Sequence, residues 1–312
     1  MTDNYKKLRI VFMGTPEFAV ASLDALIKAG CNIVGVITAP DKEAGRGLQL
    51  QQSAVKKYAA VNNLKILQPE KLKDSSFLEE LKALNADVQC VVAFRMLPEV
   101  VWNMPQLGTI NVHGSLLPQY RGAAPINWAV INGEKYTGVT TFKLQQKIDT
   151  GNILLSEKIA IEANDNAGNL HDNLKEIGAS LLVKTIILLA DGKLIELPQQ
   201  QIESYIEHAP KLTTETGKID WTKNVDEIYN LIRGLSPYPA AYTLFDRKIL
   251  KIFTAEKILE LPDNLPGTYK TDEKKFLHFA CNNGYLNITN LQLEGKKKMK
   301  IKDFLRGYRF TK

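Results

Sequence analysis

The sequence predicts an α/β protein with a Rossmann-like, mostly parallel sheet in its first part and a smaller OB-like β-barrel at its end. Apolar runs of strand length alternate with amphipathic helical segments up to about residue 190, as in parallel sheets covered on both faces. Beyond residue 208, short strands follow one another between Gly, Asn and Pro, which is typical of a small barrel. The 312 residues are enough for two such domains.

The chain opens with a strand, a helix and a second strand. An apolar run at 8–13 predicts a buried strand, Thr15 is predicted to cap the following helix, and Gly30 ends it. The next strand is predicted at 32–38. A dinucleotide site would need Gly-x-Gly-x-x-Gly after the first strand, but Gly14 is followed by Thr-Pro-Glu-Phe. The unit is therefore interpreted as scaffold, which disfavours an NAD oxidoreductase.

The remaining first part continues the alternation. Residues 39–48 are predicted to form a charged, glycine-rich loop with Arg46 between two glycines. The helices and strands predicted after it are helices at 53–61, 75–84, 126–131 and 170–189, and strands at 64–67, 87–93, 109–112, 138–144 and 153–161. We expect a catalytic domain at 1–190 and a linker at 191–208.

The last part, 209–312, is predicted to be the barrel domain. A helix begins near Ile228 and ends in a proline-rich turn by Thr243. The strands predicted after it lie at 250–254, 267–270, 276–280 and 285–293, with a strand bearing a cationic face at 296–302.

Composition excludes several classes of protein. The chain is 45% hydrophobic and 24% charged, as in ordinary globular proteins, and no run approaches the roughly 18 apolar residues of a membrane span. The first residues contain no apolar signal core. Cys31, Cys90 and Cys281 are few and scattered, and the histidines lack metal-ligand spacing. We expect a cytoplasmic monomer with free thiols, no metal and no membrane attachment.

Positive charge is concentrated in the last third. From Lys211 onward there are 19 Lys and Arg against 12 Asp and Glu, whereas the preceding residues hold 21 against 22. This asymmetry is compatible with a near-neutral catalytic body joined to a module that binds a polyanion. Charge alone favours the simpler alternative, a solvated lysine face.

A polar pair ends one of the predicted strands. Asn111 and His113 are two residues apart, so their side chains point to the same side of an extended chain. An uncharged segment, Ser-Leu-Leu-Pro at 115–118, follows after Gly114. An amide and an imidazole beside an apolar wall suit chemistry on a carbonyl group. The pair alone leaves this hypothesis and a satisfied histidine in the core equally open.

Several motifs resemble one family along nearly the whole chain. They are Phe-Met-Gly-Thr-Pro-Glu-Phe at 12–18, Asn-Val-His-Gly-Ser-Leu-Leu-Pro at 111–118, Tyr-Arg-Gly-Ala-Ala-Pro at 120–125 and Asp-Thr-Gly at 149–151, with 41–47 and 235–239. The Asn-x-His and Asp core resembles that of all 10-formyltetrahydrofolate-dependent formyltransferases. The length, the second domain and the Gly-Arg-Gly loop are similar to those of the methionyl-tRNA formyltransferases within this family.

The resemblance implies transfer of a formyl group from 10-formyltetrahydrofolate to the amino group of methionine on initiator methionyl-tRNA. It implies that Asn111 and His113 donate hydrogen bonds to the formyl oxygen, and that His113 also moves the proton of the amine. Asp149 would orient and charge His113. An Asp that merely caps its own turn is the alternative for Asp149.

The resemblance also implies binding roles. Ser115, Leu116, Leu117 and Pro118 would contact the folate, and Met96 would form another wall of its pocket. Arg46 would recognise the acceptor end of the tRNA, and the basic barrel would hold the stem. Two rival functions remain open: formyl transfer to an amino sugar nucleotide or another small amine, and RNA binding by a protein without catalytic activity.

Overall fold

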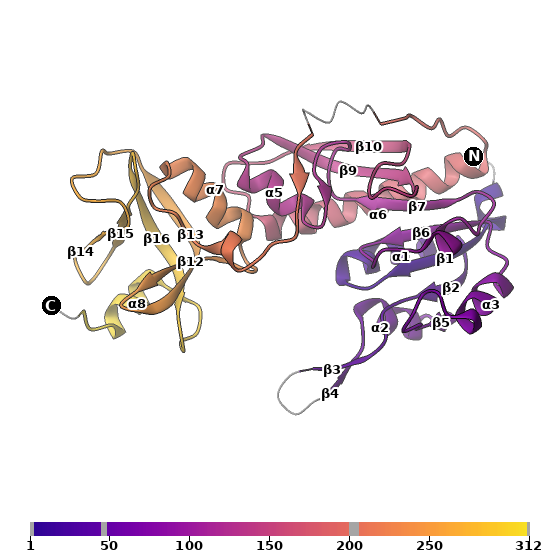
Figure 1. Ribbon diagram of the computed structural model, residues 1–312, viewed down its shortest axis with the longest axis horizontal. Coiled ribbons are helices and arrows are strands. Elements are labelled where there is room, and N and C mark those ends of the chain that lie inside the picture. Colours follow the sequence, from indigo (N-terminus) through magenta and orange to yellow (C-terminus); the bar gives the residue numbers. More distant parts are fainter. Residues whose placement is uncertain (1–2, 45–48, 200–205, 311–312) are drawn as a thin grey trace. The chain divides into compact units, whose positions relative to one another are not determined.

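The structure is a computed structural model that describes residues 3–44, 49–199 and 206–310 (Figure 1). The chain forms two compact units. The first comprises Met1–Gly122, Gly138–Ile159 and His171–His208, and the second comprises Ala123–Thr137, Ala160–Leu170 and Ala209–Lys312. Segments 123–137 and 160–170 thus belong to the second unit. The predicted linker at 191–208 stays a prediction.

The first unit is built on a seven-stranded sheet in the order β10-β9-β7-β6-β1-β2-β5. Strands β5, β2, β1, β6 and β7 run parallel, and β9 runs antiparallel to β7. The bounds are β1 Arg9–Gly14, β2 Asn32–Ile37, β5 Ile66–Leu67, β6 Val88–Val92, β7 Thr109–His113, β9 Tyr136–Lys143 and β10 Ile153–Ala160. The predicted α/β class with a mostly parallel sheet is confirmed.

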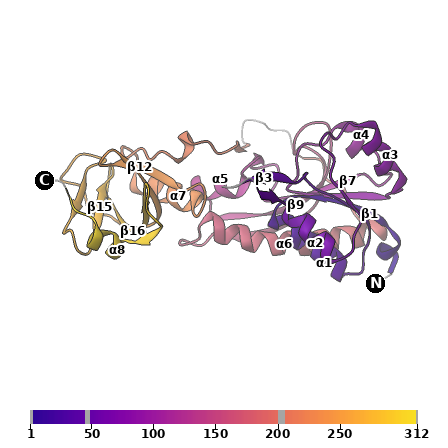
Figure 2. The ribbon, with the colours of Figure 1, turned by 90° about the horizontal axis from the view of Figure 1, so that it is seen from below.

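Helices cover both faces of this sheet. Figure 2 shows α1, α2 and α6 on one side and α3 and α4 on the other. The bounds are α1 Glu17–Lys28, α2 Ala54–Val61, α3 Ser75–Ala83, α4 Glu99–Trp102 and α6 Ala167–Ala190, with a short 3-10 helix at Asp3–Lys7. Val11 and Met13 of β1 pack with Phe77 and Leu81 of α3 in one apolar cluster. Burial on both faces explains why the parallel strands are continuously apolar.

Two local predictions in the first unit were wrong. Pro16, not Thr15, is the residue before the first turn of α1, and no side chain caps that helix. Residues 39–48 are not wholly a loop, because β3 (Lys42–Ala44) pairs antiparallel with β4 (Gln49–Gln51). Each of these strands is only three residues long, which is too short for an alternation of apolar and polar residues to reveal it in the sequence. The glycines and the proline of residues 39–48 predict only turns.

The second unit contains an antiparallel half-barrel in the order β12-β13-β16-β15-β14, with β17 paired to β16. This agrees with the predicted barrel class. Its strands are β12 Ala241–Phe245, β13 Lys248–Ile258, β14 Tyr269–Thr271, β15 Leu277–Ala280, β16 Tyr285–Leu293 and β17 Met299–Lys300. The other elements outside the first sheet are α5 Pro125–Ile131, α7 Val225–Leu235, α8 Ile301–Gly307, a 3-10 turn at Glu215–Gly217, and the short strands β8 Arg121–Gly122 and β11 His208–Ala209.

The end of the chain differs from its prediction. The strand predicted at 296–302 is wrong, since only β17 is extended there and α8 begins at Ile301. Ile301, Phe304 and Leu305 are buried in the core of this unit, and their spacing of three and four residues is that of a helix face. Within the described ranges, no helix combines the length and apolar character needed to cross a membrane.

Candidate active site

The candidate site lies at the carboxyl edge of the parallel strands. Val92 of β6 is in register with Val112 of β7, so the loops that leave these strands begin beside each other. One carries Met96, and the other is the 113–118 segment. In open α/β sheets this edge is where ligands bind.

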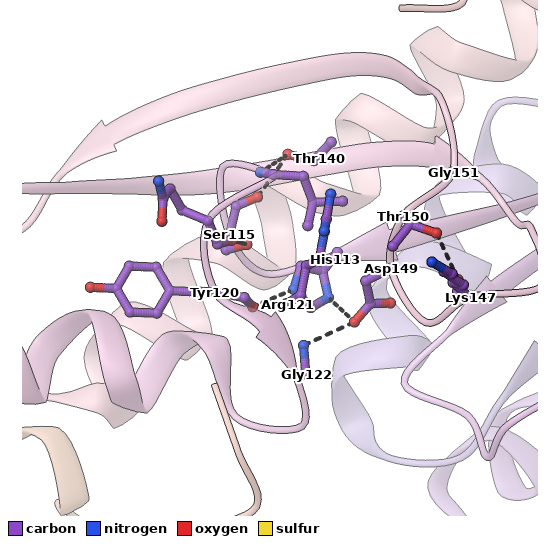
Figure 3. A network of polar contacts seen from close by, with 12 residues as sticks. His113, Ser115, Tyr120, Arg121, Gly122, Thr140, Lys147, Asp149, Thr150 and Gly151 are labelled. Carbon is purple, nitrogen blue, oxygen red and sulfur yellow. Dashed lines mark hydrogen bonds and ion pairs between the residues drawn. The ribbon is translucent and has the colours of Figure 1, made fainter. Parts of the chain in front are cut away.

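His113 and Asp149 come together across this edge (Figure 3). His113 Nδ1 lies 3.9 Å from Asp149 Oδ2, within ion-pair range but beyond hydrogen-bond length. Their side chains are 9% and 14% exposed, respectively. Asp149 is in the turn between β9 and β10, and the Gly122 N–H donates to its Oδ2 at 3.0 Å. An aspartate that is shielded and held in this way can stabilise positive charge on the imidazole.

The other nitrogen of His113 is also engaged. Nε2 lies 2.9 Å from the Tyr120 carbonyl oxygen. A carbonyl oxygen can only accept a hydrogen bond, so Nε2 is the protonated nitrogen and donates. In the neutral ring Nδ1 is therefore the basic nitrogen, and it faces Asp149. Donation from His113 to a formyl oxygen, as the resemblance implies, would require one of these two contacts to be exchanged.

Asn111 differs from His113 in having no side-chain hydrogen-bond partner among the described residues. It is half-buried on β7, two residues before His113. Within the part of the chain that the structure describes, its side-chain amide makes no hydrogen bond. A half-buried amide without a partner on the same strand face as His113 can donate to a ligand oxygen.

Thr140, on β9, holds the 115–118 segment in place through two hydrogen bonds to its backbone. The Thr140 hydroxyl donates to the Ser115 carbonyl oxygen at 2.7 Å and accepts from the Leu117 N–H at 3.1 Å. The Ser115 hydroxyl donates to the Gln119 carbonyl oxygen at 2.6 Å. These three bonds fix the course of the segment beside His113 (Figure 3).

The predicted folate contacts differ in their exposure. Ser115 and Leu117 are buried. The Ser115 hydroxyl donates to a backbone carbonyl of its own turn, and the Leu117 side chain belongs to the core. Leu116 and Pro118 are half-buried, and Met96 is 74% exposed. Among the predicted folate contacts, Leu116, Pro118 and Met96 are therefore the ones that present apolar surface to a ligand.

The predicted tRNA contact and the metal prediction concern other parts of the molecule. Arg46 lies outside the described residues. In the described ranges, no three His, Cys, Asp or Glu side chains come together in a group that could hold a metal ion.

Two family models match the sequence. The one described as Formyl transferase matches residues 8–186, and the one described as Formyl transferase, C-terminal domain, matches residues 211–309. The chain belongs to the formyl transferase family. The first match includes Asn111, His113 and Asp149, and the second covers the half-barrel.

Relatives of this formyltransferase align with it over nearly the full length of both chains. A protein of Flavobacterium johnsoniae named methionyl-tRNA formyltransferase is 54% identical over 310 residues, 98% of each chain. A protein of Bacteroides fragilis with the same name is 50% identical over 311 residues, covering 97% of this chain and 96% of the relative. The predicted resemblance to methionyl-tRNA formyltransferases, and with it the prediction of a formyl-transferring enzyme, is confirmed.

Solved structures share the fold at lower identity. WlaRD, a sugar 3N-formyl transferase determined with dTDP and 5-N-formyl-THF, superposes with a TM-score of 0.68 at 24% identity and covers 93% of this chain and 99% of its own. An N-formyltransferase of Helicobacter canadensis in complex with folinic acid and dTDP-3-aminofucose gives a TM-score of 0.69 at 23% identity, covering 94% and 100%. At these identities the comparison establishes the fold.

Sequence reasoning missed three residues of this formyltransferase that support the site. Thr140 fastens the 115–118 segment, Tyr120 supplies the carbonyl oxygen for His113, and Gln199 bonds to the turn of Asp149. Thr140 is one of several hydroxyls on an alternating strand, and Gln199 is one of three consecutive glutamines. Nothing local in the sequence distinguishes Thr140 and Gln199 from their neighbours, and the motif at 120–125 does not indicate that the backbone carbonyl of Tyr120 would bind His113.

Proposed function

We propose that this formyltransferase transfers the formyl group of 10-formyltetrahydrofolate to the amino group of methionine on initiator methionyl-tRNA. The observation that carries the proposal is the identity of 50–54% over nearly the full chain with relatives named methionyl-tRNA formyltransferase. The pairing of His113 with Asp149, near an Asn111 amide that makes no hydrogen bond within the described ranges, supports the same chemistry.

The formyl donor is proposed to be a folate. Two structural relatives were determined with 5-N-formyl-THF and with folinic acid, respectively. The exposed surface of Met96, Leu116 and Pro118 suits flat aromatic rings, and the Asn111 amide, which no described residue occupies, suits a formyl oxygen. When bound, 10-formyltetrahydrofolate supplies a formyl group on a nitrogen that can leave as an amine.

Asn111, His113 and Asp149 have separate roles in the proposed acyl transfer. As the methionine nitrogen forms a bond to the formyl carbon, negative charge develops on the formyl oxygen, and Asn111 donates a hydrogen bond to it. One such donor is typically worth about 3 kcal/mol in the transition state. His113 takes the proton of the attacking amine at Nδ1, and Asp149, 3.9 Å away, stabilises the resulting imidazolium. The same proton then passes to the departing folate nitrogen as its bond to the formyl carbon breaks.

The second unit is proposed to bind the tRNA. Between 294 and 310 it carries seven exposed cationic side chains against two acidic ones; the cations are Lys296, Lys297, Lys298, Lys300, Lys302, Arg306 and Arg309. A surface of this kind attracts phosphates irrespective of base sequence. Arg46 is proposed to contact the acceptor end of the tRNA.

A cavity in the second unit offers another contact for RNA. It has a volume of about 590 Å³, and Lys211, Lys251, Tyr238 and Tyr242 are among its lining residues. Tyr238 is 81% exposed. Ammonium groups can bind phosphates, and an exposed phenol ring can stack on an unpaired base.

Formyl transfer to different amines tests the proposal. The purified protein is incubated with 10-formyltetrahydrofolate and either initiator methionyl-tRNA or an amino sugar nucleotide, and formylated product is quantified. We expect kcat/KM to be at least 100-fold higher for the methionyl-tRNA. A preference for the sugar nucleotide would overturn the assignment of the acceptor while leaving formyl transfer intact.

A further inference from the structure

Residues 196–199 run along the turn that carries Asp149. Leu197 pairs with Ile153, the N–H of each donating to the carbonyl oxygen of the other at 2.8 and 2.9 Å. The Glu196 carboxylate accepts from Lys143 Nζ at 2.9 Å and from Asn152 Nδ2 at 3.0 Å. Residues 143, 152 and 153 flank the turn on both sides. Residues 196–199 therefore bind both ends of the turn. We refer to residues 196–199 as the clamp segment.

Gln199, the last residue of the clamp segment, reaches the turn itself. Its side-chain Nε2 donates to the Asp149 carbonyl oxygen at 2.9 Å and to the Gly151 carbonyl oxygen at 2.7 Å. Its Oε1 accepts from Arg121 Nε at 3.1 Å and Arg121 Nη2 at 2.7 Å. Gln199 is only 7% exposed. Both amide protons and both acceptor positions of this buried amide are used, which fixes its orientation.

The contacts of Gln199 act on an uncommon backbone conformation in this turn. Asp149 has φ of +53°, in the left-handed region, which residues other than glycine adopt infrequently, although aspartate tolerates it better than most. A residue in this region persists where the surrounding contacts determine its conformation. The Asp149 and Gly151 carbonyl oxygens, in the positions that this conformation gives them, accept the two hydrogen bonds that Gln199 Nε2 donates.

Gln199 also joins the two segments that meet at His113. Through Arg121 it holds the 120–122 segment, whose Gly122 N–H donates to the Asp149 carboxylate and whose Tyr120 carbonyl accepts from His113. Through its amide protons it holds the backbone of Asp149. A single side chain therefore links the two polar groups, the Tyr120 carbonyl and the Asp149 carboxylate, that lie against the nitrogens of His113.

We propose that Gln199 is a positioning residue that sets the placement of Asp149 against His113. The proposal rests on the proposed function, because it assigns Asp149 a part in formyl transfer. Gln199 acts through Asp149 and the 120–122 segment, and it has no need to touch either substrate. Its loss should therefore lower kcat and leave substrate binding intact. A misplacement of about 1 Å in a catalytic group can cost on the order of 100-fold in rate.

The test compares Gln199→Met with Gln292→Met. Methionine keeps the length of the side chain and removes all four hydrogen bonds of Gln199. Gln292, on β16 of the second unit, donates to a single backbone carbonyl, that of Lys296, so the control loses a glutamine-to-carbonyl bond away from the site. We expect Q199M to lower kcat about 30-fold with KM for both substrates within twofold, and Q292M to leave kcat unchanged.

A double-mutant cycle separates positioning from general damage. If Gln199 acts through Asp149, adding Q199M to Asp149→Asn changes kcat less than twofold. An equal 30-fold loss in both backgrounds, or a Q199M enzyme with the kcat of the wild type, would overturn the proposal. If Q199M does not fold, as judged by circular dichroism, Gln199→Glu replaces it, because the carboxylate keeps Arg121 bound and removes both donors to the turn.

A second readout does not depend on activity. Hydrogen exchange of the Gly122 amide, which donates to Asp149 Oδ2, should be at least tenfold faster in Q199M than in the wild type and unchanged in Q292M. Wild-type protein that fails to formylate methionyl-tRNA would refute the proposed function. Unchanged exchange at Gly122 in Q199M would refute the positioning role of Gln199 alone.

Discussion

Replacing Thr140 by valine removes the hydroxyl that fastens the 115–118 segment behind His113. Valine has nearly the same shape as threonine, so packing is preserved and hydrogen bonding is lost. The Ser115 carbonyl oxygen loses a donor at 2.7 Å, and the Leu117 N–H loses an acceptor at 3.1 Å. Both residues are buried, so water does not readily replace the lost partner.

The expected loss of stability follows from these two groups. A buried polar group left without a partner costs roughly 1–3 kcal/mol, and two groups at about 1.5 kcal/mol each give about 3 kcal/mol for Thr140→Val. Thr137 is the matched control on the same strand. It is also buried, but its hydroxyl has no hydrogen-bond partner among the described residues. Thr137→Val should therefore leave the free energy of unfolding unchanged or raise it by up to about 1 kcal/mol.

Urea unfolding followed by circular dichroism measures both variants against the wild type. We expect the free energy of unfolding to fall by about 3 kcal/mol for T140V and not to fall for T137V. Equal losses in the two variants would show that the hydroxyl of Thr140 does no more than that of Thr137. That result would refute the inference that Thr140 holds the segment in place.

Three further predictions concern the site and the thiols. Asn111→Ala should lower kcat by about 100- to 1,000-fold with the Kd for tRNA unchanged, as measured by steady-state kinetics and filter binding; a similar kcat would contradict its role. Gly151→Ala should lower the thermal midpoint, because a Cβ there would overlap the Lys143 carbonyl oxygen; an unchanged midpoint in calorimetry would contradict this. Burial raises the pKa of Cys31 to about 11 and that of Cys281 to about 12, so thiolate is scarce at pH 8 and both should react with a disulfide reagent only after unfolding. Rapid reaction of either thiol in the native protein would contradict their burial.

The sequence predicted the parts of the fold that depend on local pattern. Continuous apolar runs indicated the buried parallel strands, and the period of two placed Asn111 and His113 on one side of a strand. Between 296 and 302 two patterns competed. Alternating lysines favoured a strand, whereas the buried Ile301 and Phe304 followed a helical spacing and α8 formed. Tertiary burial therefore prevailed over the local alternation of charge.

The contacts between distant segments could not be predicted. Tyr120 offers its carbonyl to His113 where the chain turns back with a Tyr120 φ of +60°, and a backbone acceptor has no signature in the sequence. Gln199 meets a turn that precedes it by about 50 residues. The approach of Asp149 to His113 was expected only through the resemblance to a family, since neither spacing nor composition links the two residues.

The transfer of a labelled formyl group by wild-type protein and by His113→Ala tests the central claim most directly. Both proteins receive 10-formyltetrahydrofolate and initiator methionyl-tRNA, and the Kd for the tRNA is measured in parallel. The wild type should form N-formylmethionyl-tRNA, and H113A should lose at least 100-fold in kcat while binding the tRNA as tightly. Binding without formyl transfer by the wild type, or an H113A enzyme with the same kcat as the wild type, would contradict a formyl-transfer centre built on His113.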